Sequence, residues 1–359
     1  MFARMIFEAP LPTWAVFLEM ILGGAVVVLS GSRLTRLADE MADRLNLGSG
    51  WIGLILLATV TSLPELVTGS TAVGIGNPDL AFAAIFGSCS FNITLIVLLN
   101  AIMGGGSVLR RADTAHVLTS SFGAILMGVA LFGILLVEKF SANARIAQPI
   151  ELVWAASIFV AYVVCMKLTF NYEHHLIDAE KHTRPKRPLG SSLVTKLVMF
   201  SLVLVTASWW PARTGDVLSE HEIGFLGRPL GATLVGACFL ALATSLPEIA
   251  TSIVAVRIGN LNMALGNIFG SNMFNIFTIP FFKIVSMGRG DALLVCGPSF
   301  DASQNLIAGV LPMILTALAV AGLIYRSRTS PKRRFGFDSV LIGLTYLGGM
   351  ILLVSGPGS

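Results

Sequence analysis

The sequence predicts an all-α membrane protein with ten transmembrane helices arranged as two inverted five-helix repeats. Of its 359 residues, 55% are hydrophobic and 12% are charged, and the mean hydropathy is +0.81. Such values are typical of chains that cross a bilayer several times. Several apolar runs reach about 20 residues, the length needed to cross a bilayer as a helix. An acidic motif inside one apolar run recurs inside a later one, which indicates an internal repeat.

The composition also excludes several classes of protein. The formal net charge of +4 does not indicate nucleic-acid binding, because Lys and Arg fall in short loops between apolar runs, where positive charge sets membrane orientation. No polar block is long enough to fold as a separate soluble domain. The four cysteines form no CxxC pair, so we expect no disulfide framework, no zinc site and no resident cofactor.

Five apolar runs are expected to form the helices of the first repeat, residues 1–170. They cover about residues 14–38, 49–73, 80–102, 117–137 and 150–168. The first has a fully apolar middle and becomes amphipathic through Arg33, Leu34 and Leu37. The second contains the first acidic motif.

A polar stretch, residues 171–192, is expected to be a linker, since it carries four basic residues and two prolines. The second repeat then covers residues 193–359. Its helices are expected at about 193–210, 229–256, 262–284, 306–325 and 340–354. For the first of these, a continuation through the more polar residues 216–222 is the alternative. The second of these contains the copy of the acidic motif.

Basic residues favour one set of alternate loops. That set contains Arg33, Arg36 and Arg44, Arg110 and Arg111, the linker, Arg257, and five basic residues between 326 and 334. The positive-inside rule places these loops in the cytoplasm. Ten spans then put both termini outside, in a multi-pass protein of the cell membrane.

The two motifs are Thr61-Ser62-Leu63-Pro64-Glu65 and Thr244-Ser245-Leu246-Pro247-Glu248. They are 183 residues apart. The same offset relates Gly53 to Gly236, Gly76-Asn77 to Gly259-Asn260, Gly87-Ser88 to Gly270-Ser271, and Phe91-Asn92 to Phe274-Asn275. Because five is an odd number of helices, the second half must enter the membrane upside down. Inverted repeats are the plan of many secondary transporters, whose ion sites lie near the bilayer midplane where the repeats meet.

A carboxylate is costly in lipid, so Glu65 and Glu248 are functional candidates. On a helix each shares one face with oxygen-bearing neighbours, which are Ala58, Thr61 and Ser62 in the first half and Ala241, Thr244 and Ser245 in the second. Pro64 and Pro247 should free the carbonyls of Val60 and Ala243. The following helices add Ser88 with Asn92 and Ser271 with Asn275, each pair at i and i+4. Ca²⁺ takes roughly six to eight such hard oxygen ligands, so the set suits it better than Mg²⁺ or a soft metal.

Other interpretations of the motif fit less well. One copy is consistent with a kinked structural helix whose glutamate reaches the interface, but two copies, each followed 23 residues later by a serine, are not. Glu19 and Glu151 lie near helix ends, where an interfacial position is expected. An enzyme with Ser62 or Ser245 as nucleophile is not expected, because no His or Lys is placed to activate either serine.

These residues resemble the two α-repeats of the calcium/cation antiporters, which include the sodium/calcium and proton/calcium exchangers. The resemblance rests on Thr61–Glu65 with Gly87-Ser88, repeated as Thr244–Glu248 with Gly270-Ser271-Asn272, and it covers about 100 residues strongly. It implies that the ion is bound by the side chains of Glu65, Glu248, Ser88, Asn92, Ser271 and Asn275, by hydroxyls or carbonyls of Thr61, Ser62, Thr244 and Ser245, and by the carbonyls of Ala58 and Ala241.

The sequence departs from the family pattern at three places. Val60 and Ala243 replace a common Gly, Cys89 replaces the Asn that its counterpart Asn272 retains, and Asn275 stands where some sodium/calcium exchangers carry Asp. Two carboxylates remain, and one Ca²⁺, two Na⁺ or two H⁺ can balance them. Their mutual repulsion raises their joint affinity for protons.

The resemblance and the residues together predict a secondary-active antiporter, not an enzyme, in the lipid bilayer. It would exchange Ca²⁺ for Na⁺ or H⁺ by alternating access. The alternative is a cation channel with the same oxygen-lined site.

Overall fold

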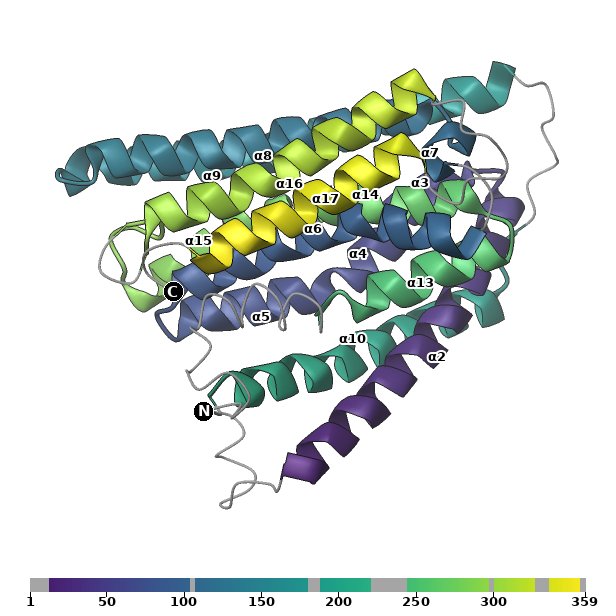
Figure 1. Cartoon of the computed structure of the whole chain (residues 1–359), viewed down its shortest axis with the longest axis horizontal. Helices are drawn as coiled ribbons and strands as arrows, with labels where there is room; N and C mark the ends of the chain where they lie inside the picture. Colours follow the sequence, from purple (N-terminus) through teal and green to yellow (C-terminus); the bar gives the residue numbers. More distant parts are fainter. Residues whose placement is uncertain are drawn as a thin grey trace.

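The computed structural model describes residues 13–103, 107–179, 188–220, 244–296, 300–326 and 336–355. Within these ranges every regular element is a helix. The helices lie side by side in one bundle, and α2 and α10 form a pair along one edge of it (Figure 1). Apolar side chains cover much of the outside of the bundle, as expected for a surface that faces lipid.

The first half of the chain begins with the long helix α2 and the broken helix that carries the first motif. Its elements are α2 (Thr13–Leu45), α3 (Ser49–Ile52), the π-helical turn η1 (Gly53–Leu57), α4 (Ala58–Thr61), α5 (Leu63–Gly74), α6 (Pro78–Met103), α7 (Val108–Arg111), α8 (Ala115–Phe140) and α9 (Ala144–Ala179). The second half contains α10 (Ser191–Glu220), α13 (Leu246–Arg257), α14 (Leu261–Phe277), α15 (Ile279–Arg289), α16 (Ala302–Tyr325) and α17 (Phe337–Ser355).

Eight helical segments of the described residues are long and apolar enough to cross a membrane. They are Ile21–Leu45, Ser49–Gly74, Pro78–Met103, Ala115–Phe140, Ala144–His175, Ser191–Ser208, Leu261–Arg289 and Ala302–Tyr325. The apolar part of α17, Phe337–Leu353, is shorter. The predicted helix at about 229–256 begins among residues 221–243, which lie outside the described residues. The total of ten spans therefore stays a prediction.

The structure extends two of the predicted helices and divides a third. The fifth predicted helix continues into the predicted linker as far as Ala179, where Phe170 and Glu173 of α9 contact Trp51. The sixth follows the longer of its two predicted extents and reaches Glu220. The eighth breaks at Thr278 into α14 and α15, where Pro280 has no N–H to continue the helical hydrogen bonds.

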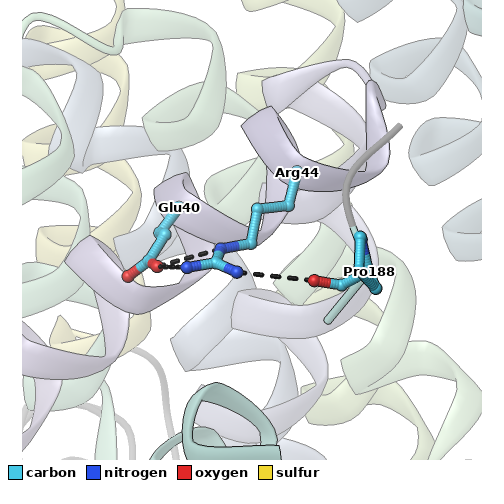
Figure 2. Close-up of polar contacts among 3 residues, drawn as sticks. All are labelled: Glu40, Arg44 and Pro188. Atoms are coloured by element: carbon cyan, nitrogen blue, oxygen red, sulfur yellow. Dashed lines mark hydrogen bonds and ion pairs between the residues drawn. The ribbon is translucent and has the colours of Figure 1, made fainter. Parts of the chain in front are cut away.

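Polar contacts define two ends of the bundle. At one end, Arg44 of α2 donates to Glu40 Oε1 (2.6 and 3.0 Å) and to the carbonyl of Pro188, just before α10 (3.4 Å; Figure 2). Asn260 also donates to Asp39 there (2.7 Å). At the other end, Arg289 donates to the carbonyl of Gly74 (2.8 Å). The end with Arg44 is the one that the positive-inside rule assigns to the cytoplasm.

The two motif helices, α5 and α13, have the same local structure. Each has 12 residues, and each is preceded by a serine outside the helical conformation: Ser62 has φ −95° and ψ 4°, and Ser245 has φ −84° and ψ 5°. After each helix a glycine takes a left-handed conformation, at φ +87° for Gly76 and φ +85° for Gly259, which favours glycine. Since α5 leads away from the end of the bundle where Asn260 meets Asp39 and α13 leads toward it, the two helices run in opposite directions.

Glycines let α14 lie directly against the broken helix of the first half. A Cβ added to Gly53 would lie 2.2 Å from the carbonyl oxygen of Met263, and one added to Gly266 would lie 2.2 Å from that of Gly50. One added to Gly270 would lie 2.6 Å from the carbonyl oxygen of Leu54. Small residues at such positions let membrane helices approach backbone to backbone.

We expect Gly266→Ala to destabilise the protein, because the carbonyl of Gly50 cannot retreat without moving the whole motif helix. Overpacking costs about 1–3 kcal/mol, and a backbone clash belongs at the upper end of that range. The melting temperature of the purified protein should therefore fall. The control is Gly128→Ala on α8, where an added Cβ meets nothing within 4 Å. Equal melting temperatures for the two variants would contradict the close contact.

Candidate ion-binding site

The structure brings Glu65 and Glu248 together inside the bundle. They are 1% and 0% exposed, respectively. Each lies in the first turn of its motif helix, where the positive end of the helix dipole stabilises a carboxylate. The two carboxylates are close enough to repel each other electrostatically.

Serine hydroxyls from both halves surround the two carboxylates. Ser62 donates to Glu248 Oε1 across the two halves (2.9 Å), and Ser271 donates to the same oxygen (3.4 Å). Ser88 donates to Glu65 Oε1 (3.4 Å) and accepts from Ser245 of the other half (3.3 Å). Glu248 is therefore contacted by serines of both repeats, whereas Ser245 of the second repeat reaches Glu65 through Ser88.

The threonines follow the same symmetry. Thr61 Oγ1 lies 3.4 Å from Ser271 Oγ, and the equivalent Thr244 Oγ1 lies 3.4 Å from Ser88 Oγ. All four hydroxyls are fully buried. Together with Ser62 and Ser245, they form a cluster of six hydroxyl oxygens around the carboxylates.

Several oxygens in this region have no hydrogen-bond partner among the described residues. They are Oε2 of Glu65, Oε2 of Glu248, and Oδ1 of both Asn92 and Asn275. Asn92 and Asn275 lie one helical turn beyond Ser88 and Ser271. A buried polar atom without a partner is costly, and a buried charge more so. A cation bound between these oxygens would remove that cost.

The carbonyls of Ala58 and Ala241 were predicted as backbone ligands. The carbonyl of Ala58 already accepts from the N–H of Ser62 (3.1 Å) and from Thr61 Oγ1 (3.4 Å). It would have to give up the longer bond to coordinate an ion. Ala241 lies outside the described residues, and so does Ala243, whose carbonyl Pro247 was expected to free.

Two asparagines at the site were not among the predicted ligands. Asn272 donates to the carbonyl of Cys89 (3.1 Å) and accepts from Asn92 (3.1 Å), so the equivalent positions 89 and 272 meet where the halves cross. Asn267 is fully buried and accepts from Thr61 (3.3 Å). Its place one turn before Ser271, on the same face of α14, is the sequence signal that could have identified it.

Glu151 lies near the start of α9, at the helix end where an interfacial position is predicted, and the protein itself covers its side chain. This carboxylate is fully buried, forms an ion pair with Lys283, and accepts from the N–H groups of Leu294 (2.8 Å) and Val295 (3.0 Å). The pair holds the loop after α15 against α9. A buried charge of this kind is retained because its partner is adjacent.

A pocket of about 480 Å³ lies at the end of the bundle opposite Arg44. Asp79, Glu138 and Asp301 line it. The N–H of Gln304 and the hydroxyl of Ser303 donate to Asp301, and these bonds hold the pKa of Asp301 below its usual value. The pocket therefore carries acidic side chains at this end of the bundle.

Comparison with known proteins identifies the family of this chain. A family model described as sodium/calcium exchanger protein matches residues 15–171 and 192–355. The chain belongs to the sodium/calcium exchanger family. This confirms the resemblance to the calcium/cation antiporters that the repeated motif suggested.

Several known proteins align with this chain over more than half of its length. CaxA, a proposed antiporter of Alkalimonas amylolytica, is 26% identical over 349 residues, which cover 94% of this chain and 98% of that protein. Inner membrane protein YrbG of Escherichia coli is 26% identical over 320 residues, covering 88% and 91%. Human sodium/potassium/calcium exchanger 2 is 27% identical over 219 residues, covering 58% of this chain and 30% of that protein.

Solved structures of the sodium-calcium exchanger NCX_Mj share the fold. One, soaked with Na⁺, has a TM-score of 0.62 and 16% identity, and the match covers 95% of this chain and 99% of that one. Another, soaked with Na⁺ and Sr²⁺, has a TM-score of 0.64 and 17% identity. The exchangers among these relatives are transporters rather than enzymes.

We expect Lys283→Met to destabilise the exchanger by about 3–5 kcal/mol, because it leaves the buried charge of Glu151 without a partner. The double variant Glu151→Gln, Lys283→Met should recover part of that loss. Thermal unfolding of the purified variants measures both effects. Since the pair lies apart from the hydroxyl cluster, Ca²⁺ affinity of the folded protein should not change, and a large change would show that the pair acts on the ion site.

Proposed function

We propose that this protein is a secondary-active antiporter that exchanges Ca²⁺ for Na⁺ or H⁺ across the cell membrane by alternating access. The observation that carries the proposal is the buried pair Glu65 and Glu248, each with one carboxylate oxygen that lacks a partner among the described residues. Two such charges in a membrane protein require a cation or protons to balance them.

The proposed ligands are the predicted set. The two carboxylates would bind the ion together with hydroxyl, amide or carbonyl oxygens of Thr61, Ser62, Ser88, Asn92, Thr244, Ser245, Ser271, Asn275, Ala58 and Ala241. Ca²⁺ accepts an irregular shell of oxygens, whereas Mg²⁺ requires a tight octahedron and loses its water reluctantly. Among the described residues, no group of three or more His, Cys, Asp or Glu side chains could hold a softer metal.

Charge balance at the two carboxylates explains why the protein would exchange cations. One Ca²⁺, two Na⁺ or two H⁺ would each neutralise the two carboxylates. The site without a cation would keep two repelling charges in a region of low dielectric, so movement between its two open states would be unfavourable. The protein would therefore move when loaded, and it would exchange one cation for another without net charge transfer.

The helix pair α2 and α10 is suited to the movement because it lies along one edge of the bundle (Figure 1). Its spanning segments are 39% and 28% buried, the same values as those of α16 and α9, compared with 72% for the spans that contain α6 and α14. We propose that this pair moves against the rigid motif helices and opens the site to one side at a time. In this scheme residues 1–170 and 193–359 form two inverted repeats with ten spans. The linker would then be cytoplasmic and both termini would be outside.

The coupling ion can be identified by transport into proteoliposomes. We expect uptake of radioactive Ca²⁺ when an outward Na⁺ gradient or an outward H⁺ gradient (acidic interior) is imposed, and the gradient that drives uptake identifies the counter-ion. A monovalent gradient should be needed because the empty site cannot return. Uptake with neither gradient, accompanied by a steady current, would support the channel instead.

We expect Glu65→Gln and Glu248→Gln each to abolish gradient-driven Ca²⁺ uptake, because one charge is removed from a divalent site while the shape of the side chain is kept. The control is Glu40→Gln on α2, whose side chain is 46% exposed at the end of the bundle. Elution as a single folded species verifies each variant. Normal uptake by either site variant would remove that glutamate from the proposed ligands.

A further inference from the structure

Asn267 breaks the symmetry of the hydroxyl cluster. It lies on α14 one turn before Ser271 and is fully buried. The equivalent position in the first half, 183 residues earlier, is Ala84. Alanine has no polar side chain, so the side-chain hydrogen bonds of Asn267 cannot be repeated at that position.

Two hydroxyls of α13 fix the orientation of the Asn267 amide. Its Nδ2 donates to Thr251 Oγ1 (3.0 Å) and to Ser252 Oγ (3.1 Å). Thr251 in turn donates its only proton to the carbonyl of Pro247 (2.7 Å). If the amide were flipped, Oδ1 of Asn267 would face Thr251 Oγ1. Neither oxygen would then have a proton to donate to the other, so the flipped orientation is unfavourable. The carbonyl oxygen of Asn267 is therefore held toward Thr61.

This orientation decides what the Thr61 hydroxyl can do. The amide oxygen of Asn267 has no proton, so Thr61 must be the donor in their 3.3 Å hydrogen bond. Thr61 has a single proton, which either the Asn267 amide oxygen (3.3 Å) or the carbonyl of Ala58 (3.4 Å) can accept. Once Asn267 accepts it, both lone pairs of Thr61 remain for other partners, such as a cation next to Glu248, whose Oε1 takes the proton of Ser271.

We propose that Asn267 is a positioning residue that presents Thr61 as an oxygen ligand and so strengthens Ca²⁺ binding on the Glu248 side of the site. Asn267 does not itself touch the ion. It works through Thr61, whose proton it holds away from the carboxylates. The inference rests on the proposed function of this site, because it assumes that a cation binds there.

The test is Asn267→Ala, with affinity measured as equilibrium binding of radioactive Ca²⁺ to the purified protein. Partners that orient a metal ligand typically contribute about 10–100-fold in affinity, so we expect a loss of about tenfold. The rate of gradient-driven uptake at saturating Ca²⁺ should stay within about twofold of the wild type, since the carboxylates and hydroxyls remain. A loss of rate without a loss of affinity would contradict the proposal.

The matched control is Asn100→Ala. Asn100 is also a fully buried asparagine with two partners, since it donates to Ser339 and accepts from the N–H of Val108 (2.5 Å). It lies near the end of α6, away from the motif. This variant should lower the melting temperature without changing Ca²⁺ affinity. A tenfold loss of affinity here as well would show that any buried asparagine has the same effect.

A double-mutant cycle separates positioning from general packing. In a Thr61→Val background the hydroxyl that Asn267 orients is gone, so Asn267→Ala should have little further effect on Ca²⁺ affinity. An undiminished loss in that background would mean that Asn267 acts by another route, and the proposal would be wrong.

If Asn267→Ala does not fold, the double variant Thr251→Ala, Ser252→Ala tests the same idea, because it leaves Asn267 in place and frees its amide to flip. We expect a loss of affinity in the same direction, and an unchanged affinity would overturn the proposal. Measurements on the wild type separate a failure of the proposed function from a failure of the proposed role of Asn267. A wild type that neither binds Ca²⁺ nor shows gradient-driven uptake refutes the proposed function, whereas normal wild-type behaviour with unaltered variants refutes only the role of Asn267.

Discussion

Two carboxylates buried next to each other are the constraint on which the rest of this structure depends. Water cannot compensate Glu65 and Glu248 inside the bundle, so the protein surrounds them with other polar groups. Each motif helix begins just before its glutamate, which brings the positive end of the helix dipole to the carboxylate. Each half also sends serine hydroxyls to the other. These contacts reduce the cost of the charges but leave one oxygen of each carboxylate without a hydrogen-bond partner in the described part of the chain.

The opposite directions of α5 and α13 bring oxygens from both motif helices to one place. A single motif helix could supply one carboxylate and two hydroxyls on one face, which is too few oxygens for a dehydrated ion. Because α5 and α13 run in opposite directions, their first turns can meet in the middle while their other ends lie at opposite ends of the bundle. The close approach also needs glycine, since Gly53, Gly266 and Gly270 meet backbone atoms that a Cβ would displace. The repeated motif and these glycines therefore form one structural unit.

The sequence predicted most of the residues that form the cluster, because their grouping depends on spacing along the chain. A motif repeated at 183 residues, with serines at the same distance in each copy, identifies residues that share helical faces. It does not reveal contacts between halves. Asn267 was missed because its role depends on Thr61, and the ion pair of Glu151 was missed because its partner Lys283 is 132 residues away. The extension of α9 was missed for the same reason, since Trp51 stabilises its polar last turns.

The two halves are similar in backbone but unequal in side chains, and this inequality has a consequence for exchange. Glu248 Oε1 accepts from two serines, at 2.9 and 3.4 Å, whereas Glu65 Oε1 accepts from Ser88 at 3.4 Å. Asn267 has Ala84 as its counterpart, and Asn272 has Cys89. One divalent ion shared by both carboxylates would experience the sum of these environments. Two monovalent ions, one at each carboxylate, would experience them separately and bind with different affinities. An unequal pair therefore affects the monovalent-loaded state more than the calcium-loaded state, so the side chains that differ between the repeats can set the balance of exchange without any change in the two glutamates.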